Sequence, residues 1–229
     1  MTALHEDPRV RRGMERQLEL RRRMLADGAR PIGWKLGLGT AAAMEKLGTN
    51  AALVGFLTDR GLIEPGSTCA IGDWHKPTAE PEVAIHIAAE VPGDADLATA
   101  VAAIHSLGAA FELVDLGDAG DVEEVLAGDV FHRHVVLGPA DASAGDALSA
   151  EIQRGDEDAE TVEDPYALTG DPGSVVAHVA THLASFGETL RAGDVIIAGS
   201  IVPALAISPG ERLRYRLEPA GELALAFTA

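Results

Sequence analysis

The spacing of apolar residues along the chain predicts four helices. Met14, Leu18 and Met24 form an apolar stripe at helical spacing in a segment whose other faces carry arginine, which predicts a helix over residues 7–28. A second amphipathic helix follows Asp171, a residue that is suited to the N-cap position. The predicted helices cover residues 7–28, 40–47, 95–107 and 174–186.

Short apolar or alternating runs predict strands between and after these helices. A strand or loop is expected over residues 54–58, and strands over 82–88, 109–114, 135–137, 151–154, 194–198 and, as a pair that turns at 219–221, within 210–227. Residues 141–172 are rich in acidic side chains and are expected to form a surface excursion. A few helices among many short strands indicate an α+β fold rather than a doubly wound parallel sheet.

The composition argues against several classes of function. The formal net charge of -18 argues against an extended nucleic-acid surface and an anionic membrane partner, because both need a basic field. Cys69 is the only cysteine, so an internal disulfide and a zinc site built from thiolates are excluded. Residues 1–12 lack the apolar core of a signal peptide, and no apolar run reaches transmembrane length. We therefore expect a cytoplasmic protein with no nucleic-acid or membrane partner.

Three glutamates are the main candidates for chemistry. Glu80 and Glu82 lie two residues apart at the start of a predicted strand, so both carboxylates can point to the same face. Glu112 interrupts the apolar run of residues 109–114. Buried carboxylates this close together need a proton or a cation, and all-oxygen ligation suits Mg²⁺ or Mn²⁺. The alternative is a solvated strand face, which the spacing of Glu80 and Glu82 alone favours.

Lys35 lies in a glycine-rich apolar segment, residues 28–39. Burial there would lower the pKa of its ammonium and suit it to proton transfer, and the same group can hold a substrate carboxylate. The alternative, which the motif alone favours, is a surface lysine whose stem packs on apolar neighbours. Gly199 and Ser200 follow an apolar strand, and we interpret them as a backbone or hydroxyl contact to substrate.

The histidines give weaker indications. His132 and His134 alternate, so they can face one side of a strand. His178 and His182 have helical i, i+4 spacing without the glutamate of the metalloprotease pattern, which favours a helix surface or a subunit contact. His75 lies in a predicted turn.

Several short motifs follow one another in a fixed order along nearly the whole chain. They are Gly-Ala-Arg-Pro-Ile-Gly-Trp-Lys-Leu-Gly-Leu at 28–38, Leu-Gly at 47–48, Gly-Phe-Leu-Thr-Asp at 55–59, Glu-Pro-Glu-Val-Ala at 80–84, Ala-Phe-Glu-Leu-Val-Asp at 110–115, Gly-Asp-Pro at 170–172, Gly-Glu-Thr-Leu-Arg-Ala-Gly-Asp-Val-Ile at 187–196, Gly-Ser at 199–200, Pro-Gly at 209–210 and Gly221. Each motif is weak alone, but the ordered set is specific. It resembles the 2-keto-4-pentenoate hydratase/4-oxalocrotonate decarboxylase family of the fumarylacetoacetate hydrolase superfamily.

The resemblance implies a fold and a site. The implied fold is a mixed β-sheet roll or barrel of the fumarylacetoacetate hydrolase C-terminal type with peripheral helices. Residues 1–60 would form an N-terminal helical and strand segment packed on a catalytic β-roll domain, residues 61–229. The implied site holds Mg²⁺ or Mn²⁺ on Glu80, Glu82 and Glu112, and Lys35 would bind substrate and transfer a proton.

The resemblance also implies a reaction. The expected enzyme is a hydratase of aromatic catabolism, a carbon–oxygen lyase that forms a homo-oligomer and acts on a small 2-oxo or 2-hydroxy carboxylic acid. In such hydratases the metal chelates the C1 carboxylate and the C2 oxygen of a 2-hydroxy-2,4-dienoate and stabilises the enolate. Protonation then gives an α,β-unsaturated ketone, and water adds at C4.

The positions that surround the substrate in this family differ here. The departures are Leu53-Val54, Leu116-Gly117, Gly128-Asp129 and Glu163-Asp164-Pro165. They leave other functions open beside the hydratase. These are a decarboxylase of a 4-oxalocrotonate-like acid, an acylpyruvate carbon–carbon hydrolase with His75 as the nearest candidate base, a non-catalytic partner subunit, and a biosynthetic enzyme that uses the same enolate chemistry.

Overall fold

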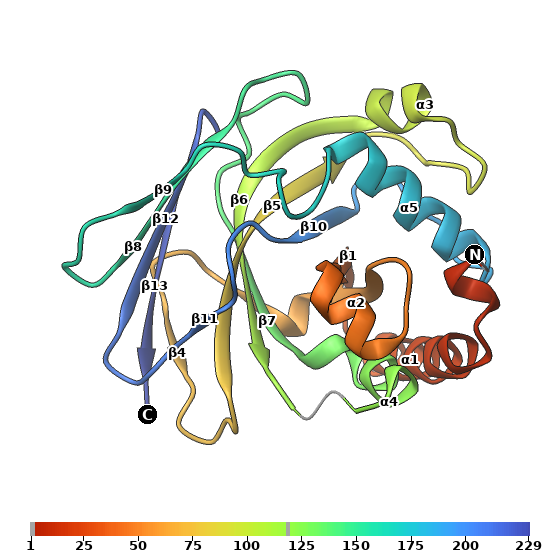
Figure 1. Ribbon diagram of the computed structural model, residues 1–229, viewed down its shortest axis with the longest axis horizontal. Coiled ribbons are helices and arrows are strands. Elements are labelled where there is room, and N and C mark those ends of the chain that lie inside the picture. Colours follow the sequence, from red (N-terminus) through yellow and green to blue (C-terminus); the bar gives the residue numbers. More distant parts are fainter. Residues whose placement is uncertain (1–2, 118–119) are drawn as a thin grey trace.

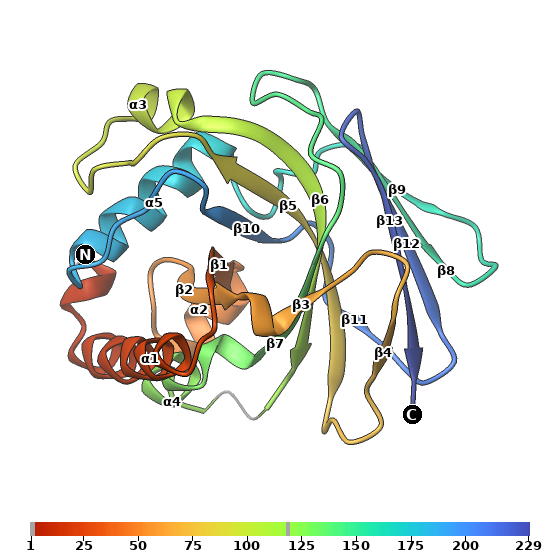
Figure 2. The same cartoon turned by 180° about the vertical axis from the view of Figure 1, so that it is seen from behind.

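Two β-sheets face each other, and the main helices lie on the far side of the larger sheet (Figures 1 and 2). The computed structural model describes residues 3–117 and 120–229. The larger sheet is mixed and runs β2-β1-β10-β5-β6-β7-β3, with β11 paired to β5. Its strands are β1 (Pro31–Gly37), β2 (Leu53–Thr58), β3 (Leu62–Ile63), β5 (Pro77–Ile87), β6 (Ile104–Asp115), β7 (His132–Leu137), β10 (Val195–Ser200) and β11 (Leu205–Ala206). This curled half-barrel confirms the predicted α+β class.

The second sheet and the helices complete the architecture. The second sheet runs β4-β13-β12-β8-β9 and consists of β4 (Thr68–Ala70), β8 (Ser149–Arg154), β9 (Glu160–Val162), β12 (Arg212–Glu218) and β13 (Gly221–Thr228). The α-helices are α1 (Pro8–Ala26), α2 (Ala41–Leu47), α3 (Leu97–Ala102), α4 (Val122–Ala127) and α5 (Pro172–Ala184). Short 3₁₀ turns cover η1 (Leu4–Glu6), η2 (Asp59–Gly61) and η3 (Asp129–Phe131). No described helix is long and apolar enough to span a membrane.

Local sequence signals place the two longest helices correctly. The Asp7 and Asp171 carboxylates accept hydrogen bonds from backbone N–H groups in the first turns of α1 and α5, which stabilises both N-termini. The predicted helix over 95–107 is wrong in its second half, because the chain leaves the helix after Ala102 and enters β6 at Ile104. Leu107 pairs there with Ile85 of β5, and this long-range pairing outweighs the local preference for helix. Helix α4 was not predicted, although Asp121 caps its N-terminus and Val122, Val125 and Leu126 form its buried face.

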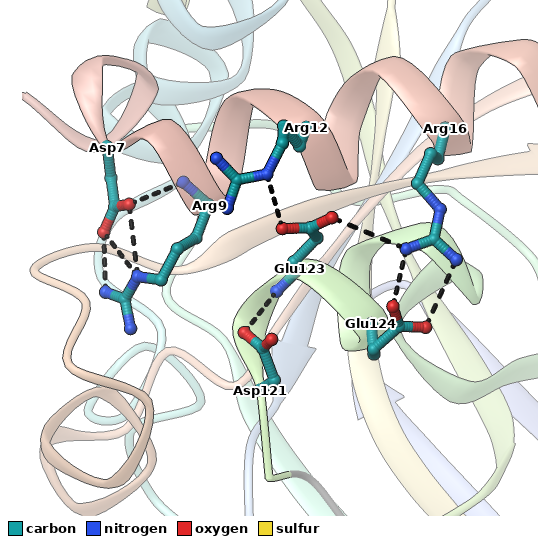
Figure 3. Close-up of polar contacts among 7 residues, drawn as sticks. All are labelled: Asp7, Arg9, Arg12, Arg16, Asp121, Glu123 and Glu124. Carbon is teal, nitrogen blue, oxygen red and sulfur yellow. Dashed lines mark hydrogen bonds and ion pairs between the residues drawn. The ribbon is translucent and has the colours of Figure 1, made fainter.

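Helix α1 is fixed to α4 by a close crossing and by ion pairs (Figure 3). A Cβ atom at Gly13 would lie only 2.7 Å from the Cβ atom of Leu126, so the crossing needs glycine. Arg12 contacts Glu123 at 2.7 Å, and Arg16 contacts Glu124 at 2.6 Å. Exposed pairs of this kind add about 0–1 kcal/mol each, so the packing contributes more than the charges. Part of the basic face of α1 is therefore used against α4.

Strands from both ends of the chain share the larger sheet. β1 pairs in parallel with β10 and antiparallel with β2. A Cβ atom at Gly33 would lie 1.9 Å from the Val195 carbonyl oxygen, which confirms the close backbone approach that the glycine-rich segment indicated. The division at residue 60 stays a prediction, and strands from both sides of it belong to this sheet.

Candidate active site

Glu80, Glu82 and Glu112 lie together on one face of the larger sheet. Glu80 and Glu112 are direct partners in the antiparallel pairing of β5 with β6, and Glu82 is two residues further along the same face. One oxygen from each carboxylate lies within 4.8 Å of the others. Glu82 and Glu112 are fully buried, and Glu80 is partly exposed. The structure therefore brings together the three carboxylates that the strand spacing had suggested.

Each of the two buried carboxylates has one oxygen held by the protein and one without a partner. Glu82 Oε2 accepts a hydrogen bond of 2.6 Å from the Gly199 N–H, while Glu82 Oε1 has no partner in the described chain. Glu112 Oε1 lies 2.5 Å from Lys35 Nζ and 2.6 Å from His132 Nδ1, while Glu112 Oε2 has no partner there. A buried carboxylate oxygen without a donor is costly. Two such oxygens beside Glu80 fit the first coordination shell of a hard divalent cation.

Lys35 on β1 is buried, and its ammonium points at Glu112. Nζ also donates a 3.0 Å hydrogen bond to the Val130 carbonyl oxygen. Burial by itself would lower the pKa of Lys35, but the carboxylates of Glu112 and Asp129 outweigh it, and the pKa is raised. Lys35 is therefore not the surface lysine that the motif alone favoured, and the pKa shift expected on burial has the wrong direction. The reason is that the partners come from β6 and η3, far away in the sequence.

Asp129 is a site residue that the sequence did not single out for chemistry. Asp129, Val130 and Phe131 have φ values of 56°, 53° and 64°, a left-handed turn that side chains rarely adopt. This turn directs the Val130 carbonyl oxygen to Lys35 and the Asp129 carboxyl to the Phe56 N–H at 2.9 Å. Burial raises the pKa of Asp129 to about 7. Its only sequence signal was the departure from the family pattern at residues 128–129.

A β-bulge separates the two alternating histidines. In the pairing of β6 with β7, Leu113 faces His134 but Val114 faces His132, so one extra residue lies between the pairs. His132 thereby turns to the face of Glu112, while His134 stacks on Trp74 with ring centroids 5.8 Å apart. The prediction that both histidines face one side is wrong for this reason.

The other histidines lie away from the three carboxylates. Of the two alternatives for His178 and His182, a helix surface is wrong for His182, which is buried, while His178 is partly buried with Nε2 3.0 Å from the Ala52 carbonyl oxygen; a subunit contact stays a prediction. Burial lowers the pKa of both, to about 3 for His182, so they are neutral near pH 7. His75 is exposed in the turn before β5.

A cavity of about 670 Å³ opens beside the carboxylates. Glu80, Gly199 and Ser200 lie in its wall, which α2, α5 and the segments around β10 complete. Gly37 also lines it, and a Cβ atom there would come within 3.8 Å of Lys35 Nζ, so the ammonium lies directly behind this wall. The Gly199 N–H donates to Glu82 at 2.6 Å, whereas the Ser200 hydroxyl makes only a long contact of 3.5 Å to the Pro81 carbonyl oxygen, so Ser200 is the better placed of the two predicted substrate contacts.

The carboxylates make the stability of the metal-free protein depend on pH. Burial raises the pKa of Glu80 from 4.5 to about 7, and burial together with Glu112 and Glu80 raises that of Glu82 well above 4.5. Between pH 4.5 and 7 the folded state therefore binds more protons than the unfolded state. The stabilisation from protonated Glu80 is fully present below pH 4.5 and is lost as the pH rises through about 7.

We expect divalent cations to stabilise the protein more at pH 8 than at pH 5.5. Protons and a cation compete for the same carboxylates, so the increase in Tm on adding Mg²⁺ or Mn²⁺ grows with pH. Differential scanning fluorimetry with and without the ion, in buffers that bind no metal, measures this difference. An equal increase at both pH values would contradict the link between these carboxylates and the ion.

Comparisons with known proteins point to one group of enzymes. No family model matches the chain. A 4-oxalocrotonate decarboxylase of Pseudomonas sp is 26% identical over 223 residues, which cover 96% of this chain and 87% of the relative. A 2-hydroxyhexa-2,4-dienoate hydratase of Comamonas testosteroni is 27% identical over 237 residues, which cover 100% of this chain and 90% of the relative. The structure of 4-oxalocrotonate decarboxylase from Pseudomonas putida G7, complexed with magnesium and adipate, superposes on this chain with a TM-score of 0.85 at 26% identity. The match covers 94% of this chain and 84% of the decarboxylase chain.

Proposed function

We propose that this chain, a member of the 2-keto-4-pentenoate hydratase/4-oxalocrotonate decarboxylase family within the fumarylacetoacetate hydrolase fold, is a metal-dependent lyase that adds water to a 2-hydroxy-2,4-dienoate. The observation that carries this proposal is the pair of unpartnered oxygens on Glu82 and Glu112, beside Glu80 at the cavity wall. These three residues would hold Mg²⁺ or Mn²⁺. When bound, the ion would act as a Lewis acid on the carboxylate and 2-oxygen of the substrate and gather the charge of the enolate.

The residues around the carboxylates have separate tasks in this proposal. His132 and the Gly199 N–H each hold one carboxylate oxygen, which orients the opposite oxygen toward the ion. Lys35 is a protonated donor behind the cavity wall, so it can bind the substrate carboxylate or deliver a proton to a carbon of the enolate. The Val130 carbonyl oxygen fixes the position of the Lys35 ammonium by a hydrogen bond, and the Asp129 carboxyl favours its charged form.

Decarboxylation of a 4-oxalocrotonate-like acid is the second candidate. The likeness to a 4-oxalocrotonate decarboxylase is as extensive as the likeness to a hydratase. Both reactions pass through a charge-stabilised enolate, so the three carboxylates serve either. The hydrolase alternative has less support, because its candidate base His75 is outside the cavity wall.

Two assays in parallel decide between these reactions. We expect Mg²⁺- or Mn²⁺-dependent loss of the dienoate absorbance of 2-hydroxypenta-2,4-dienoate, with one water added for each molecule consumed. CO₂ release from 4-oxalocrotonate without hydration of the dienoate would instead establish the decarboxylase. Metal binding without turnover of either acid would contradict both and support a non-catalytic subunit.

A further inference from the structure

The cavity beside the carboxylates is larger than the smallest acids of the proposed reaction require. A five-carbon hydroxydienoate has eight heavy atoms, which fill roughly 240 Å³ at about 30 Å³ for each water-sized group. The cavity holds about 670 Å³, in the range of pockets that take a drug-sized ligand. More than half of this space therefore extends beyond the groups that would react at Glu80.

The wall of this extra space is mainly apolar. Side chains from several elements contribute to it, among them Leu36, Met44, Leu116, Leu168, Val175 and Val202. Polar side chains in the wall are largely engaged within the protein. Thr40 Oγ1 caps α2 by accepting from the Ala43 N–H, and Ser174 Oγ donates to Asp171 at 2.6 Å. His178 is bonded to the Ala52 carbonyl oxygen.

The wall also lacks a positive charge. None of the described residues that line the cavity is lysine or arginine, and the His178 imidazole is neutral near pH 7. Apart from Lys35, whose ammonium lies behind the wall at Gly37, the charged groups named at its border are acids: Glu80 in the wall and Asp171 next to Ser174. A carboxylate at the far end of a substrate would lose its hydration there without gaining a counter-ion.

We propose that the substrate carries a single carboxylate, at its reacting end, and an apolar tail that fills the rest of the cavity. This inference rests on the proposed function, because it takes Glu80 and its neighbours as the site of the reacting carboxylate. It distinguishes the substrate from a short dienoate and from a diacid such as 4-oxalocrotonate. An alkyl or aryl substituent on the chain end satisfies both the volume and the chemistry of the wall.

Titration calorimetry of the full chain with saturated 2-oxo acids in the presence of Mg²⁺ tests this proposal. The probes are pyruvate, 2-oxohexanoate, 2-oxooctanoate and the matched diacid 2-oxooctanedioate. We expect binding to tighten roughly fourfold for each added methylene of the monoacids. We also expect the diacid to bind at least about tenfold more weakly than 2-oxooctanoate.

Two variants connect this preference to the cavity. Ala43→Phe puts a large side chain into the wall and is expected to remove the increase in affinity from 2-oxohexanoate to 2-oxooctanoate. Ala42→Phe, on the exposed side of α2, is the control and is expected to preserve this increase. Leu168→Arg adds a cation at an exposed wall position and is expected to strengthen binding of the diacid, whereas Ala167→Arg next to it does not. The melting temperature of each variant confirms that it folds.

The outcomes separate this inference from the proposed function. If no 2-oxo acid binds in the presence of Mg²⁺, the proposed function fails, and the inference fails with it. If pyruvate binds but chain length has no effect, or if the diacid binds as tightly as 2-oxooctanoate, only the inference is overturned. If the affinity rises step by step with chain length, and Ala43→Phe removes this rise, both the proposed function and the inference are supported.

Discussion

Replacing Glu82 with glutamine is expected to abolish metal binding and, at the same time, to make the metal-free protein more stable. Glu82 is fully buried, and burial raises its pKa well above 4.5, so its charged form opposes folding near neutral pH. A glutamine can still accept the Gly199 N–H through its amide oxygen, but it places an NH₂ group where the unpartnered oxygen was. An NH₂ group cannot ligate a cation.

Calorimetry and thermal melts measure the two effects of Glu82→Gln. We expect no saturable Mg²⁺ or Mn²⁺ binding, at least about a 100-fold loss of kcat/KM, and a Tm at pH 8 above that of the metal-free wild type. Glu90→Gln, which removes an exposed acid beyond the end of β5, is the matched control and is expected to leave all three unchanged. A Glu82→Gln protein that still gains stability from the ion would show that Glu82 is not a ligand.

Glu112→Gln provides a contrast, because it removes the same charge from a different environment. Glu112 is the partner of Lys35 and His132, and these neighbours lower its pKa against the effect of burial. Loss of one partner of a buried ion pair costs about 3–5 kcal/mol. We therefore expect both variants to lose the ion, but only Glu112→Gln to destabilise the metal-free protein.

Replacing Lys35 with methionine is expected to destabilise the metal-free protein by about 3–5 kcal/mol, because it leaves the charge of Glu112 buried without its cation. The loss is expected to be smaller in saturating Mg²⁺, since a dication on Glu112 supplies the missing positive charge. Turnover is expected to fall by a factor on the order of 10²–10⁴, the usual contribution of a positioned acid or base.

Denaturant unfolding with and without Mg²⁺, together with kinetics of the loaded enzyme, checks the effects of Lys35→Met. Lys46→Met on the exposed face of α2 is the control, and it is expected to change neither stability nor kcat. If Lys35→Met lost stability equally with and without Mg²⁺, the ion and Lys35 would not share Glu112. Unchanged kcat in a folded, metal-loaded Lys35→Met protein would remove Lys35 from the chemistry.

The predicted elements held where a short-range signal decided the structure. The N-caps at Asp7 and Asp171 begin α1 and α5, because capping depends only on the next few residues. The prediction failed at residues 103–107, where pairing of β6 with β5 overrides the local preference for helix. Near the site, the bulge that separates His132 from His134 depends on the register of β6 with β7, which no local pattern reveals.

The sequence by itself determined that Glu80 and Glu82 share a face and that Glu112 interrupts an apolar strand, because side chains alternate along any strand. Only the tertiary structure decided what these carboxylates experience. The register of β5 with β6 places Glu112 opposite Glu80. The Gly199 N–H binds one oxygen of Glu82 and Lys35 binds one oxygen of Glu112, and the second oxygen of each carboxylate is left without a partner in the described chain. The tertiary structure likewise decided the raised pKa values of Lys35 and Asp129 and the apolar character of the cavity wall. Charge, burial and shape depend on segments that meet only when the chain is folded, so they cannot be derived from local spacing.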